Sequence, residues 1–304
     1  MSLTLLDYLY GVALPSGALI SELTDCTPKA NVEVLTAMCA GDVVPQFIGG
    51  QGARPQIDFR SPQIKTILDA CGLYGYDASA GNTDLHYRSG TNLSTRAATG
   101  LRIRCVRALL YWAQIQARHG GLADVGCTLV PTYDGTNAPM TPAGAITIPG
   151  MSALPQQYFT LGPVVINGSP VAGVTDWSLD LGVKTNIEAT DGESYPSWCG
   201  IESHTPVLTV NTRTLGCWAT VGVGGLALIS LAFYLRKKRL DNAGCEENVS
   251  AVHIKFTATT GVVYIDQSSG GVDGPAGGSL KIHLRRASPS ATHCLAANTA
   301  SAIT

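Results

Sequence analysis

Charged residues are scarce in this sequence. Asp, Glu, Lys and Arg make up 14% of its 304 residues, against about a quarter in ordinary globular proteins. The 20 basic and 22 acidic side chains nearly cancel, which leaves a formal net charge of −2. This balance excludes a strongly basic nucleic-acid-binding protein and a chain with an acidic tail. With so few charges, we expect much of the surface to be covered by other subunits.

Sequence signatures of metal binding and catalysis are also missing. The nine cysteines form neither a C-x-x-C pair nor a zinc spacing, and an odd number does not fit a disulfide framework. Reduced, buried thiols are therefore predicted. The sequence has no H-E-x-x-H and no G-x-S-x-G. Residues 270–275 are glycine-rich but lack the G-K-[ST] of a phosphate-binding loop. No catalytic residue, metal site or cofactor site is predicted.

The remaining chemical groups have plain structural interpretations. The six histidines are scattered. Asp176, Asp180, Asp191 and Glu193 lie close in sequence but match no calcium-binding loop, and they are read as carboxylates of strand faces and turns. The basic residues 236–239 are read as the solvated or subunit-pairing end of a long strand, with contact to DNA phosphates as the alternative.

The amino terminus has no basic region or small-residue cleavage site, so no signal peptide is expected. The longest apolar run covers residues 215–235. It carries no charge and is followed by basic residues, which is typical of a transmembrane helix with a positive-inside flank. However, four glycines interrupt its first half, and from Leu226 onward the apolar residues alternate as in a buried strand. We favour a strand from about Leu226 and keep a single-pass membrane anchor at 215–235 as the alternative.

The second half of the chain repeats features of the first half in the same order. In the first half, a strand pattern at 54–60 precedes a predicted helix at 62–71. In the second half, a strand pattern at 205–211 precedes a shorter predicted helix at 214–220.

The repeat continues after these helices. Long strands are predicted at 101–118 and 226–239, and we treat them as counterparts. Shorter strands follow at 126–133 and 157–166, and at 252–259 and 279–286. We therefore predict two tandem domains, residues 1–155 and 156–304, each with one short helix.

Four polar or glycine-rich segments are expected to lie outside the two domain cores. Residues 73–100 are predicted to be a surface insertion in the first domain, and residues 288–304 a flexible C-terminal tail. Residues 139–155 and 268–278 are predicted to be loops between strands, because their composition offers nothing to bury.

Residues 164–175, VVINGSPVAGVT, open the second domain. Within them Asn167-Gly168 is a strong hairpin-turn signal, and an alternating strand pattern follows to about residue 181. A DGE loop at 191–193 and a Pro-Val-Leu-Thr strand from Pro206 complete the pattern. This arrangement resembles bacteriophage tail tube proteins over most of residues 164–286, and more weakly over 19–166 through the repeat.

The resemblance implies a fold and an assembly. Tail tube proteins form stacked rings of six tube domains, in which strands from neighbouring subunits build an inner β-barrel around a lumen for DNA. A chain with two such domains would form the ring from three copies, as a pseudo-hexamer, which resembles some long, non-contractile phage tails. Single-domain subunits are usual in contractile injection systems.

These observations predict a mainly β (α+β) protein of two tail-tube-like β-sandwich or barrel domains. Its predicted function is structural: it is not an enzyme and polymerises into a tail conduit for DNA ejection. Its expected partners are further copies of itself and the tape measure, baseplate and terminator proteins, with DNA passing unbound and no membrane. The expected location is the virion tail, assembled in the bacterial cytoplasm. Residues 3–14 and 73–100 are candidate contacts between rings.

Three alternatives remain beside the membrane anchor. Another tail component, such as a baseplate hub or a terminator, would form one ring without polymerising. A tube protein of an injection system would share the fold. An enzyme of unknown class would show a convergent polar pocket.

Overall fold

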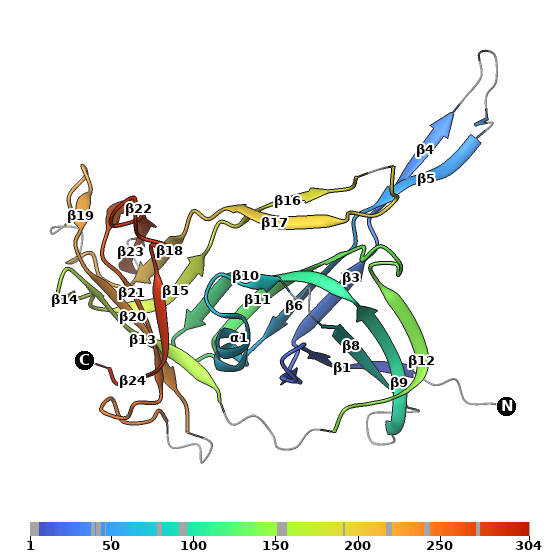
Figure 1. Cartoon of the computed structure of the whole chain (residues 1–304). Helices are drawn as coiled ribbons and strands as arrows, with labels where there is room; N and C mark the ends of the chain where they lie inside the picture. Colours follow the sequence, from blue (N-terminus) through green and yellow to red (C-terminus); the bar gives the residue numbers. More distant parts are fainter. Residues whose placement is uncertain are drawn as a thin grey trace.

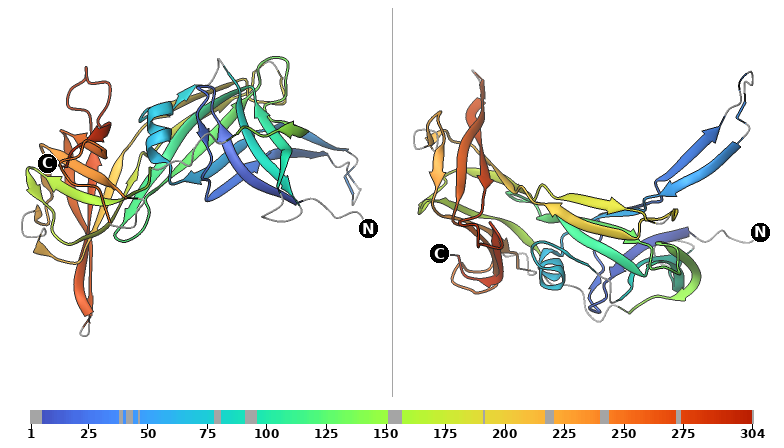
Figure 2. Two further views of the ribbon diagram at one scale, coloured as in Figure 1. Left: turned by 90° about the horizontal axis from the view of Figure 1, so that it is seen from below. Right: turned by 45° about the horizontal axis from the view of Figure 1, so that its top comes forward.

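The computed structural model describes residues 6–37, 40, 44–45, 47–77, 81–90, 96–150, 157–190, 192–216, 221–239, 244–271 and 274–303. In this part of the chain the fold is mainly β, with one short helix and no closed barrel. The prediction of a mainly β protein is therefore confirmed. The first half of the chain lies at one end of the molecule and the second half at the other (Figures 1 and 2).

Each half of the chain contains a five-stranded antiparallel sheet of the same topology. In the first half its order is β12 (Thr141–Thr147), β9 (Arg96–Cys105), β8 (Thr83–Gly90), β1 (Leu6–Ala13) and β2 (Leu19–Ile20). In the second half its order is β24 (Ala296–Ser301), β21 (His253–Ala258), β20 (Leu231–Lys237), β13 (Phe159–Ile166) and β14 (Ser169–Pro170).

A ten-stranded sheet runs through both halves. The first half contributes the unit β10 (Arg107–Arg118), β11 (Asp124–Thr132), β6 (Gln56–Ser61) and β3 (Asp25–Lys29). The second half contributes the unit β22 (Gly261–Gly271), β23 (Gly274–Leu284), β18 (Val207–Thr212) and β15 (Val174–Asp180). Two short strands, β7 (Tyr76–Asp77) and β19 (Leu226–Leu228), pair with β10 and β22 respectively.

The residues of the two four-stranded units can be aligned, because their strand pairs have register shifts at corresponding positions. The β10–β11 pair has a register shift between Trp112 and Gln114, and the β22–β23 pair has the same shift between Ile265 and Gln267. β7 pairs with the residues just before the first shift, and β19 with those just before the second. Trp112 and Ile265 are the last paired residues before the two shifts and are therefore equivalent. Tyr111 and Tyr264, which directly precede them, are equivalent as well.

A glycine precedes each short strand for the same reason. Gly75 and Gly225 have φ of 77° and 82°, a conformation that side chains with a Cβ rarely adopt. A Cβ at Gly75 would lie 2.3 Å from the carbonyl oxygen of Leu110, and one at Gly225 would lie 3.2 Å from that of Val263. The backbone thus passes close to equivalent residues in the two halves.

A hairpin links the outer strand of each unit to its neighbour. The first hairpin, β4 (Val32–Ala37) and β5 (Phe47–Ala53), lies between β3 and β6 in the chain. The second hairpin, β16 (Lys184–Glu188) and β17 (Trp198–Ser203), lies between β15 and β18.

The helix α1 (Ile64–Cys71) follows β6, as its pattern predicts. Its buried residues, Ile64, Ile67, Leu68 and Cys71, have the spacing of one helix face, and Gly72 at φ 66° ends it. The helix predicted at 214–220 lies largely outside the described residues. The turn at Asn167-Gly168 is confirmed, with φ of 51° and 81°.

The apolar run divides into separate strands. A strand begins at Leu226 as predicted, but the single long strand expected over 226–239 is wrong: residues 226–228 form β19 in the ten-stranded sheet, and residues 231–237 form β20 in a five-stranded sheet. Residues 217–220 lie outside the described part. Among the described residues, no helix has the length and hydrophobicity needed to cross a membrane.

The strand matching in the predicted repeat is wrong after the helices. Residues 101–118 contain the end of β9 and all of β10, whereas residues 226–239 contain β19 and β20. Sheet order makes β22 the counterpart of β10, and β8 the counterpart of β20. The two patterns look alike because both segments contain buried apolar residues, such as Leu110 and Leu235, but strand pairing, not hydrophobicity, defines their places in the sheets.

The four segments expected to lie outside the cores contain paired strands. Residues 73–100 are not a surface insertion, because β8 lies between β1 and β9 with Leu85 buried. Residues 288–304 are not a flexible tail, because β24 pairs with β21. The loops at 139–155 and 268–278 contain β12 and the ends of the β22–β23 hairpin. Neighbouring strands bind these backbones without needing a run of apolar side chains.

Candidate assembly interface

The two four-stranded units join through β10 and β15. The strands are antiparallel, with Gln114 opposite Asp180 and Arg118 opposite Asp176 at the ends of the paired region. Backbone hydrogen bonds extend the junction: the Leu181 N–H donates to the Ala113 oxygen at 2.9 Å, and the His119 N–H donates to the Thr175 oxygen at 2.8 Å. Main-chain pairing of edge strands therefore connects one unit to the next.

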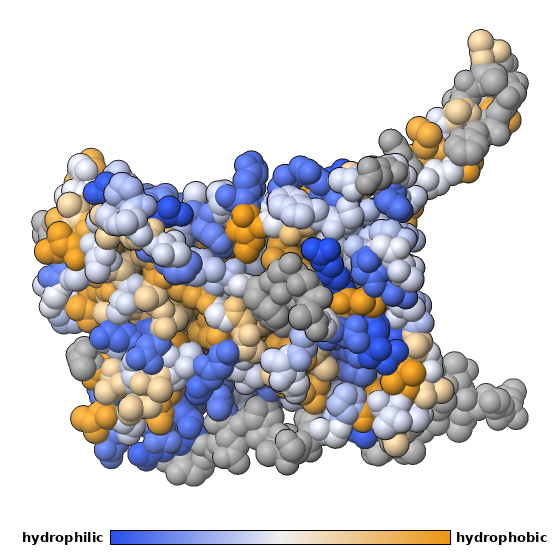
Figure 3. Space-filling view, viewed as in Figure 1, coloured by the Kyte–Doolittle hydropathy of each residue, from blue (hydrophilic) through white to orange (hydrophobic). Residues whose placement is uncertain are grey.

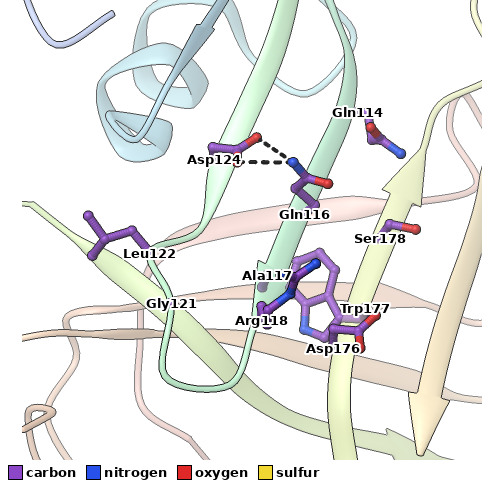
Figure 4. A pocket seen from close by; sticks show the side chains of 10 residues that line it. All are labelled: Gln114, Gln116, Ala117, Arg118, Gly121, Leu122, Asp124, Asp176, Trp177 and Ser178. Atoms are coloured by element: carbon purple, nitrogen blue, oxygen red, sulfur yellow. Dashed lines mark hydrogen bonds between the residues drawn. The ribbon is translucent and has the colours of Figure 1, made fainter. Parts of the chain in front are cut away.

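Opposite faces of the junction have opposite character. Ile115, Ala117, Trp177 and Leu179 are buried on one face, because successive side chains of a strand point to opposite sides. The other face is polar and shallowly hollowed. Figure 4 shows the side chains around this hollow of about 380 Å³, among them Gln114, Gln116, Arg118, Asp124, Asp176 and Ser178.

Acidic groups on the polar face have nearby donors. Asp124 accepts hydrogen bonds from Gln116 at 3.0 Å and from Arg60 at 3.0 Å (Figure 4 shows the Gln116 contact). Asp176 accepts one from Asn211 at 2.6 Å, and Asp266 pairs with Lys281 at 2.8 Å. The face is hydrophilic, and two of these carboxylates, Asp124 and Asp266, are paired with the cations Arg60 and Lys281.

Asp58 ties three strands together on this face. It accepts hydrogen bonds from Lys29 of β3 at 2.9 Å, Gln56 of β6 at 2.7 Å and Thr128 of β11 at 3.0 Å. Burial opposes ionisation, but the hydrogen bonds from Gln56, Lys29 and Thr128 outweigh it and hold the pKa of Asp58 below its ordinary value.

Replacing Asp58→Asn is expected to lower the free energy of unfolding at pH 7 by about 0.5–1 kcal/mol, since this half-exposed pair is screened by solvent. A depressed folded-state pKa stabilises the fold above the unfolded pKa of about 3.9 and loses that effect as pH falls through the folded value. The variant should therefore lose less stability than wild type between pH 5 and pH 2 in urea unfolding. Glu202→Gln, which breaks an exposed ion pair with Lys184, is the control. An unchanged pH dependence in Asp58→Asn contradicts this role.

The two outer edges of the units remain open. Among the described residues, β3 pairs only with β6, and β22 beyond Val263 pairs only with β23. These edges are the counterparts of the two that meet at the junction, because β3 corresponds to β15 and β22 to β10. One chain thus contains one complete junction, β10 against β15. Its outer strand edges, β22 and β3, are equivalent to the two edges that meet in that junction.

The β16–β17 hairpin lies across the first unit, above β10 and β11 (Figure 1). The Tyr133 N–H donates a hydrogen bond to the Pro196 oxygen at 2.7 Å, and the Tyr133 and Tyr195 rings are 6.1 Å apart. Thr185 and Cys199 of the hairpin lie near the side chain of Tyr111 on β10, and burial raises the pKa of the Tyr111 phenol. The hairpin therefore covers the unit to which its own unit is joined.

The carboxylates and basic residues considered in the sequence analysis do not form a common site among the described residues. Asp176 and Asp180 lie on β15, where the Asp180 carboxylate accepts from the Gly182 N–H at 2.8 Å. Glu193 is exposed in a turn, and Asp191 lies outside the described residues. Residues 236 and 237 end β20, as expected of a strand end. Within the described ranges, no cluster of three or more His, Cys, Asp or Glu side chains is arranged to hold a metal.

One aromatic cluster has no sequence signal. Tyr74 stacks on His293 at 4.1 Å and meets His204 edge-on at 5.0 Å, beside Cys294, in a hollow of about 360 Å³. The residues come from distant parts of the chain, so no sequence motif with a fixed spacing could predict the cluster. Burial raises the pKa of the Cys294 thiol, which keeps it protonated and weakly nucleophilic. The cluster offers packing and hydrogen bonding between the two halves.

No protein-family model matches this sequence, and no curated protein is significantly similar to it. Function is therefore inferred from the geometry of the chain itself.

Proposed function

We propose that this protein is a structural subunit of a phage tail tube, which assembles as stacked trimeric, pseudo-hexameric rings and conducts DNA into the host. One observation carries the proposal. Equivalent units of one chain are joined edge to edge at β10 and β15, and among the described residues the corresponding outer edges of the sheet, β3 and the part of β22 beyond Val263, pair with no further strand.

Repeating the internal junction between chains defines the ring contact. Lys29 pairs with Gln56, five residues before the end of β6, and Asp180 pairs with Val207, five residues before the end of β18. Lys29 is thus the counterpart of Asp180, and Gln267 is the counterpart of Gln114. The junction places Gln267 of one chain opposite Lys29 of the next. Such a head-to-tail contact closes into a ring when its rotation allows.

A ring of three chains would contain a wide lumen. Each chain contributes eight strands in its two units, and strands lie about 4.8 Å apart, which gives a backbone diameter of roughly 37 Å before strand tilt widens it. Barrels with fewer strands already hold an aqueous channel. The polar face of the sheet would line this lumen, because the opposite face is buried.

The chemistry of the polar face suits passage of DNA. Tight binding to DNA phosphates comes from Lys and Arg side chains that release condensed counterions. On this face Arg60 and Lys281 are already paired with Asp124 and Asp266. The resemblance of residues 164–286 to tail tube proteins and the low charge content of the chain support the same proposal. The partners would be further copies and the tape measure, baseplate and terminator proteins, in the virion tail assembled in the host cytoplasm.

Negative-stain electron microscopy of the purified protein, with native mass measurement of the smallest ring, tests the proposal. We expect hollow tubes of stacked rings, with three chains in each ring. Single rings that never stack would favour a hub or terminator. Six chains per ring, or monomers at all concentrations, would contradict the trimeric tube.

A further inference from the structure

The β4–β5 hairpin projects away from the rest of the molecule and exposes apolar side chains. It stands clear of the sheets in Figures 1 and 2, and Figure 3 shows hydrophobic residues along it. Val34 is 60% exposed and Ile48 is 65% exposed, with Val32 and Leu35 also exposed beside them. An apolar group of this kind on a projecting element marks an interaction surface.

The other hairpin supplies the comparison, because the two have the same bulge. The register shifts between Glu33 and Val34 in β4–β5 and between Lys184 and Thr185 in β16–β17. Val34 is therefore the counterpart of Thr185. Counting along the paired strands makes Ile48 the counterpart of Cys199.

Thr185 and Cys199 cover a specific residue of the neighbouring unit. The second hairpin contacts β10 through β17, and Thr185 and Cys199 are hairpin residues that lie near the side chain of Tyr111. The counterpart of Tyr111 in the second half is Tyr264 of β22, which is 43% exposed. One chain thus contains a covered tyrosine beneath its second hairpin, an exposed equivalent tyrosine, and an exposed equivalent hairpin.

We propose that the β4–β5 hairpin docks across β22 and β23 of a second copy of this chain, with Val34 and Ile48 covering Tyr264. The hairpin follows β3, just as β16–β17 follows β15, so a β3–β22 junction carries it over the neighbouring unit. The inference rests on the proposed ring and adds a second contact to it. In this arrangement the pairing of β3 with β22 sets the register between the two chains. The apolar contact of Val34 and Ile48 with Tyr264, here called the clasp, stabilises the interface.

Charge substitutions on the hairpin test the clasp. Ile48→Asp and Val34→Asp would each place a carboxylate against Tyr264 and are expected to raise the concentration needed for assembly roughly tenfold or more. Val249→Asp is the control, because Val249 is 80% exposed and lies outside the hairpin. All three unassembled variants should unfold at the wild-type temperature, since the replaced side chains are exposed. Assembly is measured by sedimentation over a concentration series.

Cysteine substitution gives an independent readout with an internal comparison. Ile48→Cys combined with Tyr264→Cys is expected to be cross-linked between chains by a bis-maleimide reagent, which spans the space that the tyrosine side chain fills. Tyr111→Cys is expected to be cross-linked by the same reagent to the native Cys199 within a chain. Normal assembly of Ile48→Asp together with no 48–264 cross-link in assembled wild-type-like rings would overturn the clasp and leave the ring proposal standing. A 48–264 cross-link in rings that never stack would support the clasp and overturn the tube, and a chain that neither assembles nor cross-links overturns both.

Discussion

A variant carrying Lys29→Cys and Gln267→Cys is expected to form disulfides between chains and none within a chain. The two positions lie on strands at opposite ends of the ten-stranded sheet, so one chain cannot join them. Directly opposed residues of antiparallel strands have Cα atoms about 4.5–5.5 Å apart, which is within the range that a disulfide spans. On a non-reducing gel, assembled protein should give a ladder that ends at three chains.

The internal junction provides the control for this experiment. Gln114→Cys combined with Asp180→Cys has the equivalent register inside one chain, and it should form an intramolecular disulfide in assembled and unassembled protein alike. If the internal pair forms its bond while the 29–267 pair stays reduced in assembled tubes, the proposed ring contact is wrong. A ladder that ends at six chains would contradict the trimeric ring.

Replacing Trp177→Ala is expected to lower the free energy of unfolding by about 3–5 kcal/mol. Trp177 is 1% exposed and lies on β15, the strand that joins the two units. Its ring meets those of Phe233 and Phe256 edge-on, at 5.1 Å and 6.1 Å. The substitution leaves a cavity between the ten-stranded sheet and the sheet of β20 and β21, and urea unfolding of the unassembled protein measures the loss.

Trp198→Ala is the matched control for this prediction. Trp198 lies on β17 and is 46% exposed, so its removal should change the free energy of unfolding by no more than about 0.5 kcal/mol. Similar losses in the two variants would show that the aromatic cluster around Trp177 does not dominate the stability of the second half.

Local patterns predicted several elements well. The helix α1 followed from apolar spacing and a closing glycine, β15 from its alternation, and the turn before β14 from Asn167-Gly168. These features depend on residues near one another in the chain, whose periodicity and φ preferences are intrinsic. The order of the first strands in each half was recognisable for the same reason.

Polar strands were the main failure of the sequence prediction. β8 consists mostly of polar residues, β24 of Ala, Asn, Thr and Ser, and the far end of β22 of Gln, Ser and Gly, so all three resemble surface segments. Their partners lie far away in the chain, and those partners satisfy the backbone N–H and C=O groups. Composition carries no record of that pairing, so the counterpart of β20 was also misplaced.

The sequence by itself determined that the chain is mainly β, that it contains a repeat, and that it has no motif for catalysis or metal binding. Short-range periodicity, low charge and glycine placement are enough for these conclusions. Only the tertiary structure decided how the repeats meet. Strand β10 pairs with β15, and the equivalent strands β22 and β3 lie at the two outer edges of the sheet. The β16–β17 hairpin packs on the first unit, whereas the equivalent β4–β5 hairpin projects from the molecule. Those relations depend on hydrogen bonds and packing between residues more than fifty positions apart, which no local pattern encodes.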